Sequence, residues 1–131
     1  MRLTNAERAL GASLVVYVVV DVLLTPLARL ETRNPANVTA LGITTLVLIF
    51  IGLALSVIAL VLLVRRSKRV SMVAIIAAVL YFPAAVAEWT GTFSSLRAPS
   101  AIAWLEVVQA VVAVVVIGAA YSVRRGATAK P

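Results

Sequence analysis

The run from Leu41 to Val64 contains no charged residue and ends at a basic cluster, Arg65 to Arg69. A second apolar run begins directly afterwards, at Val70, and continues to Trp89. Apolar runs longer than about 18 residues are typical of membrane-spanning helices. Because the basic cluster is too short to run back along a helix, the two helices must form an antiparallel pair.

The whole chain repeats this alternation of apolar runs and short polar connections. We predict an all-α integral membrane protein with a single membrane domain, residues 1–131. Its four antiparallel helices are expected at about 9–28, 41–64, 70–89 and 101–123. Thr4 and Glu7 have the spacing of a capping box before the first helix. A cleaved signal peptide is the alternative for this helix, but Asp21 within its apolar part argues against it.

The composition supports the same class and excludes several kinds of chemistry. Of 131 residues, 63% are hydrophobic and only 13% are charged, which no ordinary soluble domain shows. Cysteine and histidine are absent, so disulfides, the usual zinc sites, haem ligation and histidine acid–base catalysis are excluded. We expect no cofactor and no metal site. The net charge of +7 does not indicate nucleic acid, because the basic residues lie at the ends of the apolar runs.

Those basic residues predict an orientation. The two ends of the chain and the basic cluster carry nine of the twelve Lys and Arg residues. The two remaining connections carry Arg29, Arg33 and Arg97. Positively charged loops stay in the cytoplasm, so both termini are predicted to be cytoplasmic in a multi-pass protein of the cell membrane.

Small residues at helical spacing predict the faces on which the helices meet, because apolar burial does not drive helix association in lipid. The second helix has Gly52, Ser56 and Ala59 on one face. The predicted face of the third helix consists of Ala74, Ala78, Tyr81, Ala85 and Glu88, and that of the fourth consists of Ala103, Glu106, Ala110 and Ala113. Pro83 lies inside the third helix and is expected to kink it, leaving the Val79 carbonyl free.

Several polar side chains lie at one predicted depth, roughly 10 Å below the outer surface at a helical rise of 1.5 Å per residue. They come from three helices and are Asp21, Tyr81, Glu106 and Gln109. Charged groups at such depth normally face protein or water rather than lipid. Two carboxyl groups sharing a partly dry site do not both ionise easily. We therefore predict an outward-facing acidic cavity between the first, third and fourth helices.

The predicted ligand-binding residues are those four together with Tyr17 and Glu88. Tyr17 stands one turn before Asp21, on a stripe with Ser13 and Thr25, and can hydrogen-bond to its carboxylate. Each polar residue also has a purely structural interpretation. Asp21 can be held by Tyr17 and backbone, Glu106 can be hydrated, Glu88 can pair with Arg97, and Gln109 can bond neighbouring helices.

Three functions from different classes follow from this cavity. The first is binding or transport of a small cationic or lipophilic ligand, or of protons. The second is a cofactor-free membrane enzyme, of the isomerase, cyclase or epoxide-opening type, with Asp21 and Glu106 as its catalytic acid and base. The third is an accessory or scaffold subunit of a larger membrane complex. The expected partners are the lipid bilayer, that ligand, and a homo-oligomer or larger membrane complex.

Overall fold

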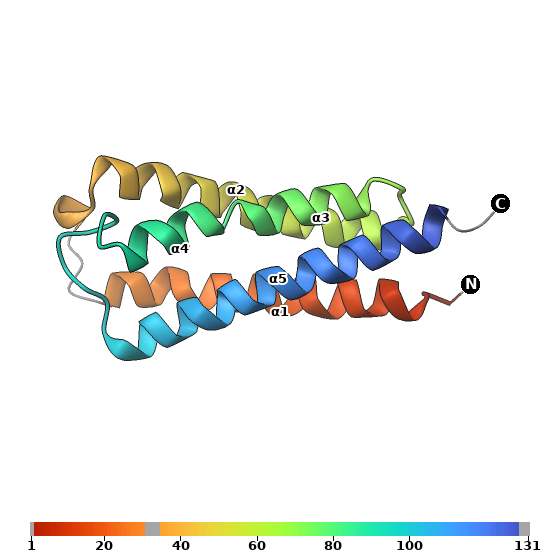
Figure 1. Ribbon diagram of the computed structural model, residues 1–131, viewed down its shortest axis with the longest axis horizontal. Coiled ribbons are helices and arrows are strands. Elements are labelled where there is room, and N and C mark those ends of the chain that lie inside the picture. The colour runs from red at the N-terminus through yellow and green to blue at the C-terminus, as the bar shows by residue number, and fades with distance from the viewer. Residues whose placement is uncertain (1, 31–34, 129–131) are drawn as a thin grey trace.

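The computed structural model describes residues 2–30 and 35–128 and contains four long helices lying side by side (Figure 1). The first is α1 (Asn5–Leu30), the second α2 (Ala40–Val64) and the last α5 (Ser100–Thr128). The third is divided into α3 (Val70–Val79) and α4 (Phe82–Trp89). A short 3-10 turn, η1 (Pro35–Asn37), precedes α2. The prediction of an all-α protein with four helices is therefore confirmed.

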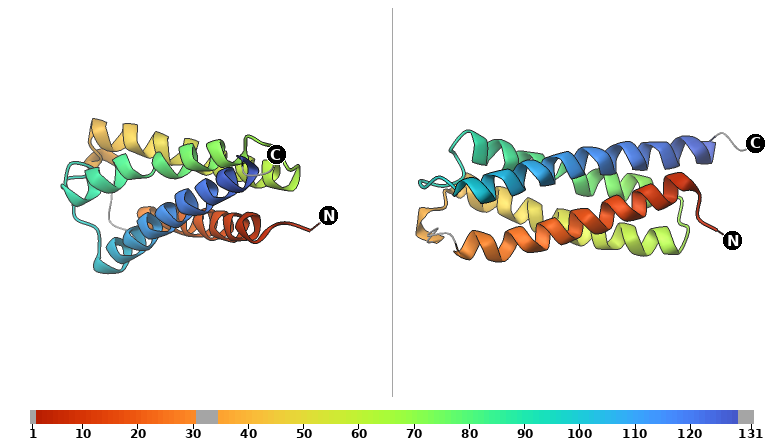
Figure 2. Two further views of the ribbon diagram at one scale, coloured as in Figure 1. Left: turned by 45° about the vertical axis from the view of Figure 1, so that its right-hand side comes forward. Right: turned by 90° about the horizontal axis from the view of Figure 1, so that it is seen from below.

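The described ends of the chain lie at the same end of the bundle, and successive helices run in opposite directions (Figures 1 and 2). Helix α1 packs against α2 and α5, and α3 packs against the same two helices. The four helices therefore form a ring in which each contacts two antiparallel neighbours.

Within the described residues, three helical segments are long and apolar enough to cross a membrane, Ala40–Val64, Val70–Trp89 and Ser100–Ala127. This indicates a multi-pass membrane protein. The outer surface of the bundle is apolar, since large side chains such as Val47, Phe50 and Val111 are about half exposed. The interior is lined by small residues, including Ala59, Ala74 and Ala113, each with no exposed surface. Helices that associate in lipid have this arrangement, because small residues let their backbones approach closely.

The predicted contact faces are buried except at Glu88, Ala103 and Glu106, which are half-buried. Gly52, Ser56 and Ala59 of α2 are buried, as are Ala74, Ala78, Tyr81 and Ala85 of the third helix and Ala110 and Ala113 of α5. At Gly52 an added Cβ would stand 2.9 Å from the Ala77 carbonyl oxygen. Only a residue without a side chain allows this approach of α2 to α3.

Two helices extend beyond their predicted bounds. Helix α1 begins at Asn5 rather than about residue 9, because the predicted capping box forms. The Glu7 carboxylate accepts from the Thr4 backbone N–H at 2.7 Å, and the Glu7 N–H donates to the Thr4 hydroxyl at 3.2 Å. Helix α5 continues past Val123 to Thr128, and the Arg125 guanidinium stacks 5.0 Å from the centroid of the Tyr121 ring. The end of an apolar run is thus not the end of this helix.

The two connections at the end opposite the termini are joined by backbone hydrogen bonds. The Thr39 N–H donates to the Phe93 carbonyl at 3.0 Å, and the Ser95 N–H donates to the Asn37 carbonyl at 3.0 Å. Val38 and Ser94 form an isolated antiparallel bridge. Thr39 also caps α2, its hydroxyl accepting from the Gly42 N–H at 3.0 Å. We call this end of the bundle the loop end. Arg33, which entered the charge count, lies outside the described residues, as does Lys130.

Pro83 interrupts the third helix as expected, and the interruption lies at Leu80 and Tyr81. Proline has no N–H to donate to a carbonyl four residues earlier, and its ring crowds the preceding turn. The Tyr81 N–H donates to Ala78 at 3.3 Å, three residues back, instead of to Ala77. The break therefore leaves the carbonyl of Ala77 outside the helical hydrogen-bond ladder.

Candidate functional site

The polar stripe predicted on the first helix faces the interior of the bundle. Ser13, Tyr17 and Asp21 are all buried, and Asp21 is only 2% exposed. Val15, Val16 and Val19, on the opposite face, are about half exposed. The spacing of four residues places the stripe on one side of α1. Thr25, the last predicted member, has a side chain outside the described part of the structure.

Tyr17 reaches across the bundle to the broken helix. Its hydroxyl donates to the Ala77 carbonyl at 3.5 Å, a long hydrogen bond. This is the carbonyl that the interruption at Tyr81 leaves outside the ladder. From the sequence, this hydroxyl can hydrogen-bond to Asp21, one turn away on the same helix. The structure directs it to a backbone oxygen that the sequence pattern had not indicated.

Gln109 connects α5 to the same part of α1. Its side chain is fully buried, and the Nε2 amide donates to the Tyr17 carbonyl at 3.2 Å. Its Oε1 atom is also buried and accepts no hydrogen bond from the described residues. Gln109 thus holds α5 to α1 by one bond and presents an acceptor to the interior.

Tyr81, at the break in the third helix, contacts another of the predicted residues, Glu106 of α5. Its hydroxyl donates to the backbone carbonyl of Glu106 at 2.9 Å, which ties the broken helix to α5. Tyr81 and Asp21 are both buried, with 3% and 2% of their surfaces exposed.

Glu88 and Glu106 line a hollow of about 290 Å³ at the loop end of the bundle. Arg97, Ser94 and Trp89 are among the other lining residues. Tyr17, Asp21, Tyr81 and Gln109 are not among them. The six predicted residues are thus divided between this hollow and the buried interior beneath it. Glu106 belongs to both, because it lines the hollow and one of its carboxylate oxygens is buried.

Two contributors were missed by sequence reasoning. The Ala77 carbonyl is a backbone group, and only its position six residues before Pro83 could have suggested it. The wall of the hollow formed by the 94–98 segment depends on the hydrogen bonds that join the two connections at the loop end. Arg97 was predicted as a partner for Glu88, and the structure places both in the same hollow.

Among the residues that the structure describes, no group of three or more His, Cys, Asp or Glu side chains is arranged to hold a metal ion. Comparison of the chain with protein-family models, with curated proteins and with solved structures gives no match.

Proposed function

We propose that this chain is a four-span protein of the cell membrane that binds a small cationic ligand, in competition with protons, at an acidic site entered from the loop end. The site consists of Asp21 at its base and of Glu106 and Glu88 at its entrance. Tyr17, Tyr81 and Gln109 hold the surrounding helices in place. Transport of the bound cation is the function that such a site would serve.

One observation carries this proposal. Asp21 is buried to 98% by its own bundle rather than facing lipid. Removing a carboxylate from water is costly unless it is paired or loses its charge. Intramembrane acidic residues therefore mark ion and proton sites more often than they serve packing alone.

Two further features support a fourth membrane span at α1 and an outward position of the hollow. The outward face of α1 is apolar, with Val22 and Leu23 about half exposed, which suits a fourth span. The basic cluster lies at the end of the bundle away from the hollow, so the charge bias places the hollow on the outer side. Carboxylates at a recessed entrance attract cations by their field.

The experiment is equilibrium binding of tetraphenylphosphonium, a lipophilic cation, to the purified full chain in detergent. The wild type should bind saturably, and binding should weaken as the pH falls, because protons compete for the same carboxylates. Asp21→Asn, which preserves size, should lower affinity at least about thirtyfold, the usual cost of removing one partner of a buried charge pair.

Glu7→Gln is the matched control. It removes the same charge at the opposite end of α1, and glutamine retains the capping box. Its affinity should equal that of the wild type. The proposal is wrong if Asp21→Asn binds as tightly as the wild type, or if the wild type shows no saturable binding. The enzyme and subunit alternatives remain predictions.

A further inference from the structure

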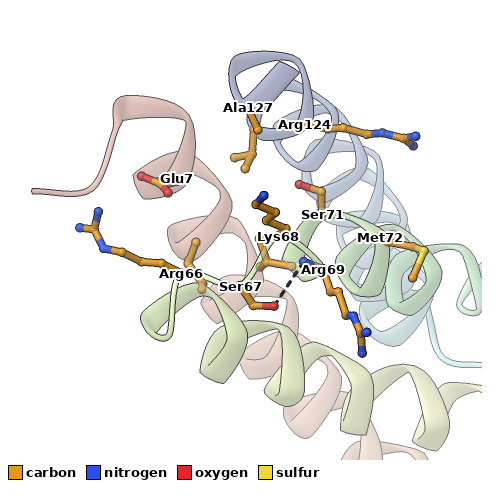
Figure 3. A pocket seen from close by; sticks show the side chains of 12 residues that line it. Glu7, Arg66, Ser67, Lys68, Arg69, Ser71, Met72, Arg124 and Ala127 are labelled. Carbon is orange, nitrogen blue, oxygen red and sulfur yellow. Dashed lines mark hydrogen bonds between the residues drawn. The ribbon is translucent and has the colours of Figure 1, made fainter. Parts of the chain in front are cut away.

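A second hollow, of about 500 Å³, lies at the other end of the bundle, where α2 turns into α3 (Figure 3). Its polar lining comes from three helices and one connection. Those lining residues include Glu7, Ser67, Lys68, Arg69, Ser71 and Arg124. The acidic site described above uses none of them.

The connection that forms this hollow is fixed by the end of α2. The Ser67 N–H donates to Leu62 at 2.9 Å and the Arg66 N–H donates to Leu63 at 3.0 Å, the pattern of a Schellman motif. Arg66 takes the left-handed conformation that this motif requires, with φ of 54°. The chain therefore reverses within a few residues, and Ser67 to Arg69 lie beside the start of α3.

The start of α3 is left without a side-chain cap. Its N-cap residue is Arg69, which makes no capping hydrogen bond, whereas Thr39 caps α2. In the described chain the backbone N–H groups of Ser71 and Met72 donate no hydrogen bond to another backbone group. Unpaired amides and the helix dipole make such a helix start suitable for an anion.

Ser71 gives a second and independent indication. Its side chain is 95% buried and lines the hollow, yet its hydroxyl has no hydrogen-bond partner among the described residues. In Figure 3 the side chains of Ser71 and Lys68 point into the space beneath Ala127, while Arg124 extends away from it. Lys68 forms no ion pair in the described chain, so its ammonium group is available to a ligand.

Among the described residues, Glu7 is the one carboxylate that lines the hollow. One of its oxygens accepts from the Thr4 N–H in the capping box, so it is held toward the start of α1. Lys68, Arg66, Arg69 and Arg124 around the hollow outnumber it. The balance of charge therefore favours an anion.

We propose that this hollow binds a phosphate group, held by the Lys68 ammonium, the Ser71 hydroxyl and the first-turn amides of α3. The phosphate can belong to the headgroup of an anionic phospholipid or to free phosphate. The chemistry is the same in both cases, namely charge-assisted hydrogen bonds to anionic oxygens. Basic pockets between membrane helices are known to suit such headgroups.

The test measures the rise in melting temperature of the purified full chain as ligand is added in dodecylmaltoside. The ligands are dioleoylphosphatidylglycerol, dioleoylphosphatidylcholine and inorganic phosphate. We expect saturable stabilisation by phosphatidylglycerol and little by phosphatidylcholine. Stabilisation by inorganic phosphate to the same extent would identify free phosphate as the source, and stabilisation by phosphatidylglycerol alone would identify the lipid. Either result supports the site.

Ser71→Ala is the decisive variant because it changes no charge. It should weaken the phosphate-bearing ligand about tenfold, the effect of losing one hydrogen bond to a charged group. Ser71→Thr keeps the hydroxyl and should restore binding. If anionic lipid were attracted only by the positive charge of the surface, neither Ser71→Ala nor Ser71→Thr would change its affinity.

Lys68→Gln and Arg65→Gln form a matched pair, since both remove one positive charge from the same turn and Arg65 does not line the hollow. Lys68→Gln should weaken binding more than tenfold, whereas Arg65→Gln should weaken it less than about fivefold, as expected for a surface charge. Equal losses in the two variants, an unaffected Ser71→Ala, or no stabilisation by either phosphate-bearing ligand would overturn the proposal.

Discussion

Gly52 lies where α2 packs against the break in the third helix. A Cβ there would stand 2.9 Å from the Ala77 oxygen, 3.5 Å from the Leu80 Cβ and 3.8 Å from the Tyr17 hydroxyl oxygen. Gly118, in contrast, has no atom within 4 Å of its hypothetical Cβ. The two glycines therefore have different reasons to be present, although both lie in apolar helices.

We expect Gly52→Ala to destabilise the bundle by about 1–3 kcal/mol, the usual cost of overpacking, because the neighbour at 2.9 Å is a backbone atom. Gly118→Ala should be neutral or should stabilise by up to about 1 kcal/mol through helix propensity. Unfolding of each variant in mixed micelles with increasing dodecyl sulfate measures the difference. A Gly52→Ala protein as stable as Gly118→Ala would show that α2 and α3 are not packed as closely as described.

The third helix, considered as an element, combines a break with a hydrogen bond to another helix. Pro83 interrupts the regular ladder of backbone hydrogen bonds, and the Tyr81 N–H donates to the Ala78 carbonyl, three residues earlier. The Ala77 carbonyl is therefore available to accept from the Tyr17 hydroxyl. The break thus allows a hydrogen bond between α1 and α3, two helices that are not neighbours in the ring. It also places Tyr81 where its hydroxyl reaches α5.

This arrangement predicts coupling between Pro83 and Tyr17. Tyr17→Phe should cost about 0.6 kcal/mol, typical of one interhelical hydrogen bond in a membrane protein. In a Pro83→Ala background the helix can regain its ladder, the Ala77 carbonyl can accept from Tyr81, and the cost of Tyr17→Phe should fall toward zero. A double-mutant cycle of unfolding free energies gives the coupling. Additive effects would mean that the break does not supply the acceptor for Tyr17.

At the scale of the whole molecule, the two ends of the bundle differ in charge. One end has the basic cluster and the described ends of the chain, and the other has the two joined connections with Glu88 and Arg97 nearby. The positive-inside rule predicts that the first end is cytoplasmic.

The chain has no cysteine, so a single cysteine introduced by mutation is the only thiol that a labelling reagent can modify. Its labelling therefore reports the orientation of the protein. A membrane-impermeant maleimide added to intact cells should label Ser95→Cys, at the loop end. Ala127→Cys, at the other end, should be labelled only after the cells are made permeable. Labelling in the reverse order would place the acidic hollow in the cytoplasm and contradict the proposed direction of ligand entry.

The sequence by itself determined the helices and the faces they bury. Apolar runs, the capping residues Thr4 and Glu7, and small residues at helical spacing act locally, so their consequences are visible before folding. For the same reason Ser13, Tyr17 and Asp21 could be assigned to one inward face. The apolar runs do not mark the start of α1 or the end of α5, since a capping box begins α1 at Asn5 and α5 continues to Thr128, past the Tyr121–Arg125 contact.

Only the tertiary structure decided how those faces meet. A shared depth for Asp21 and Glu106 did not specify that the first would be buried while the second opens to a hollow. Likewise, the pairing of Tyr17 with Ala77 joins residues far apart in the chain and uses a backbone oxygen that no side-chain pattern reveals. Contacts of this kind depend on the rotation and separation of whole helices, which many side chains set together.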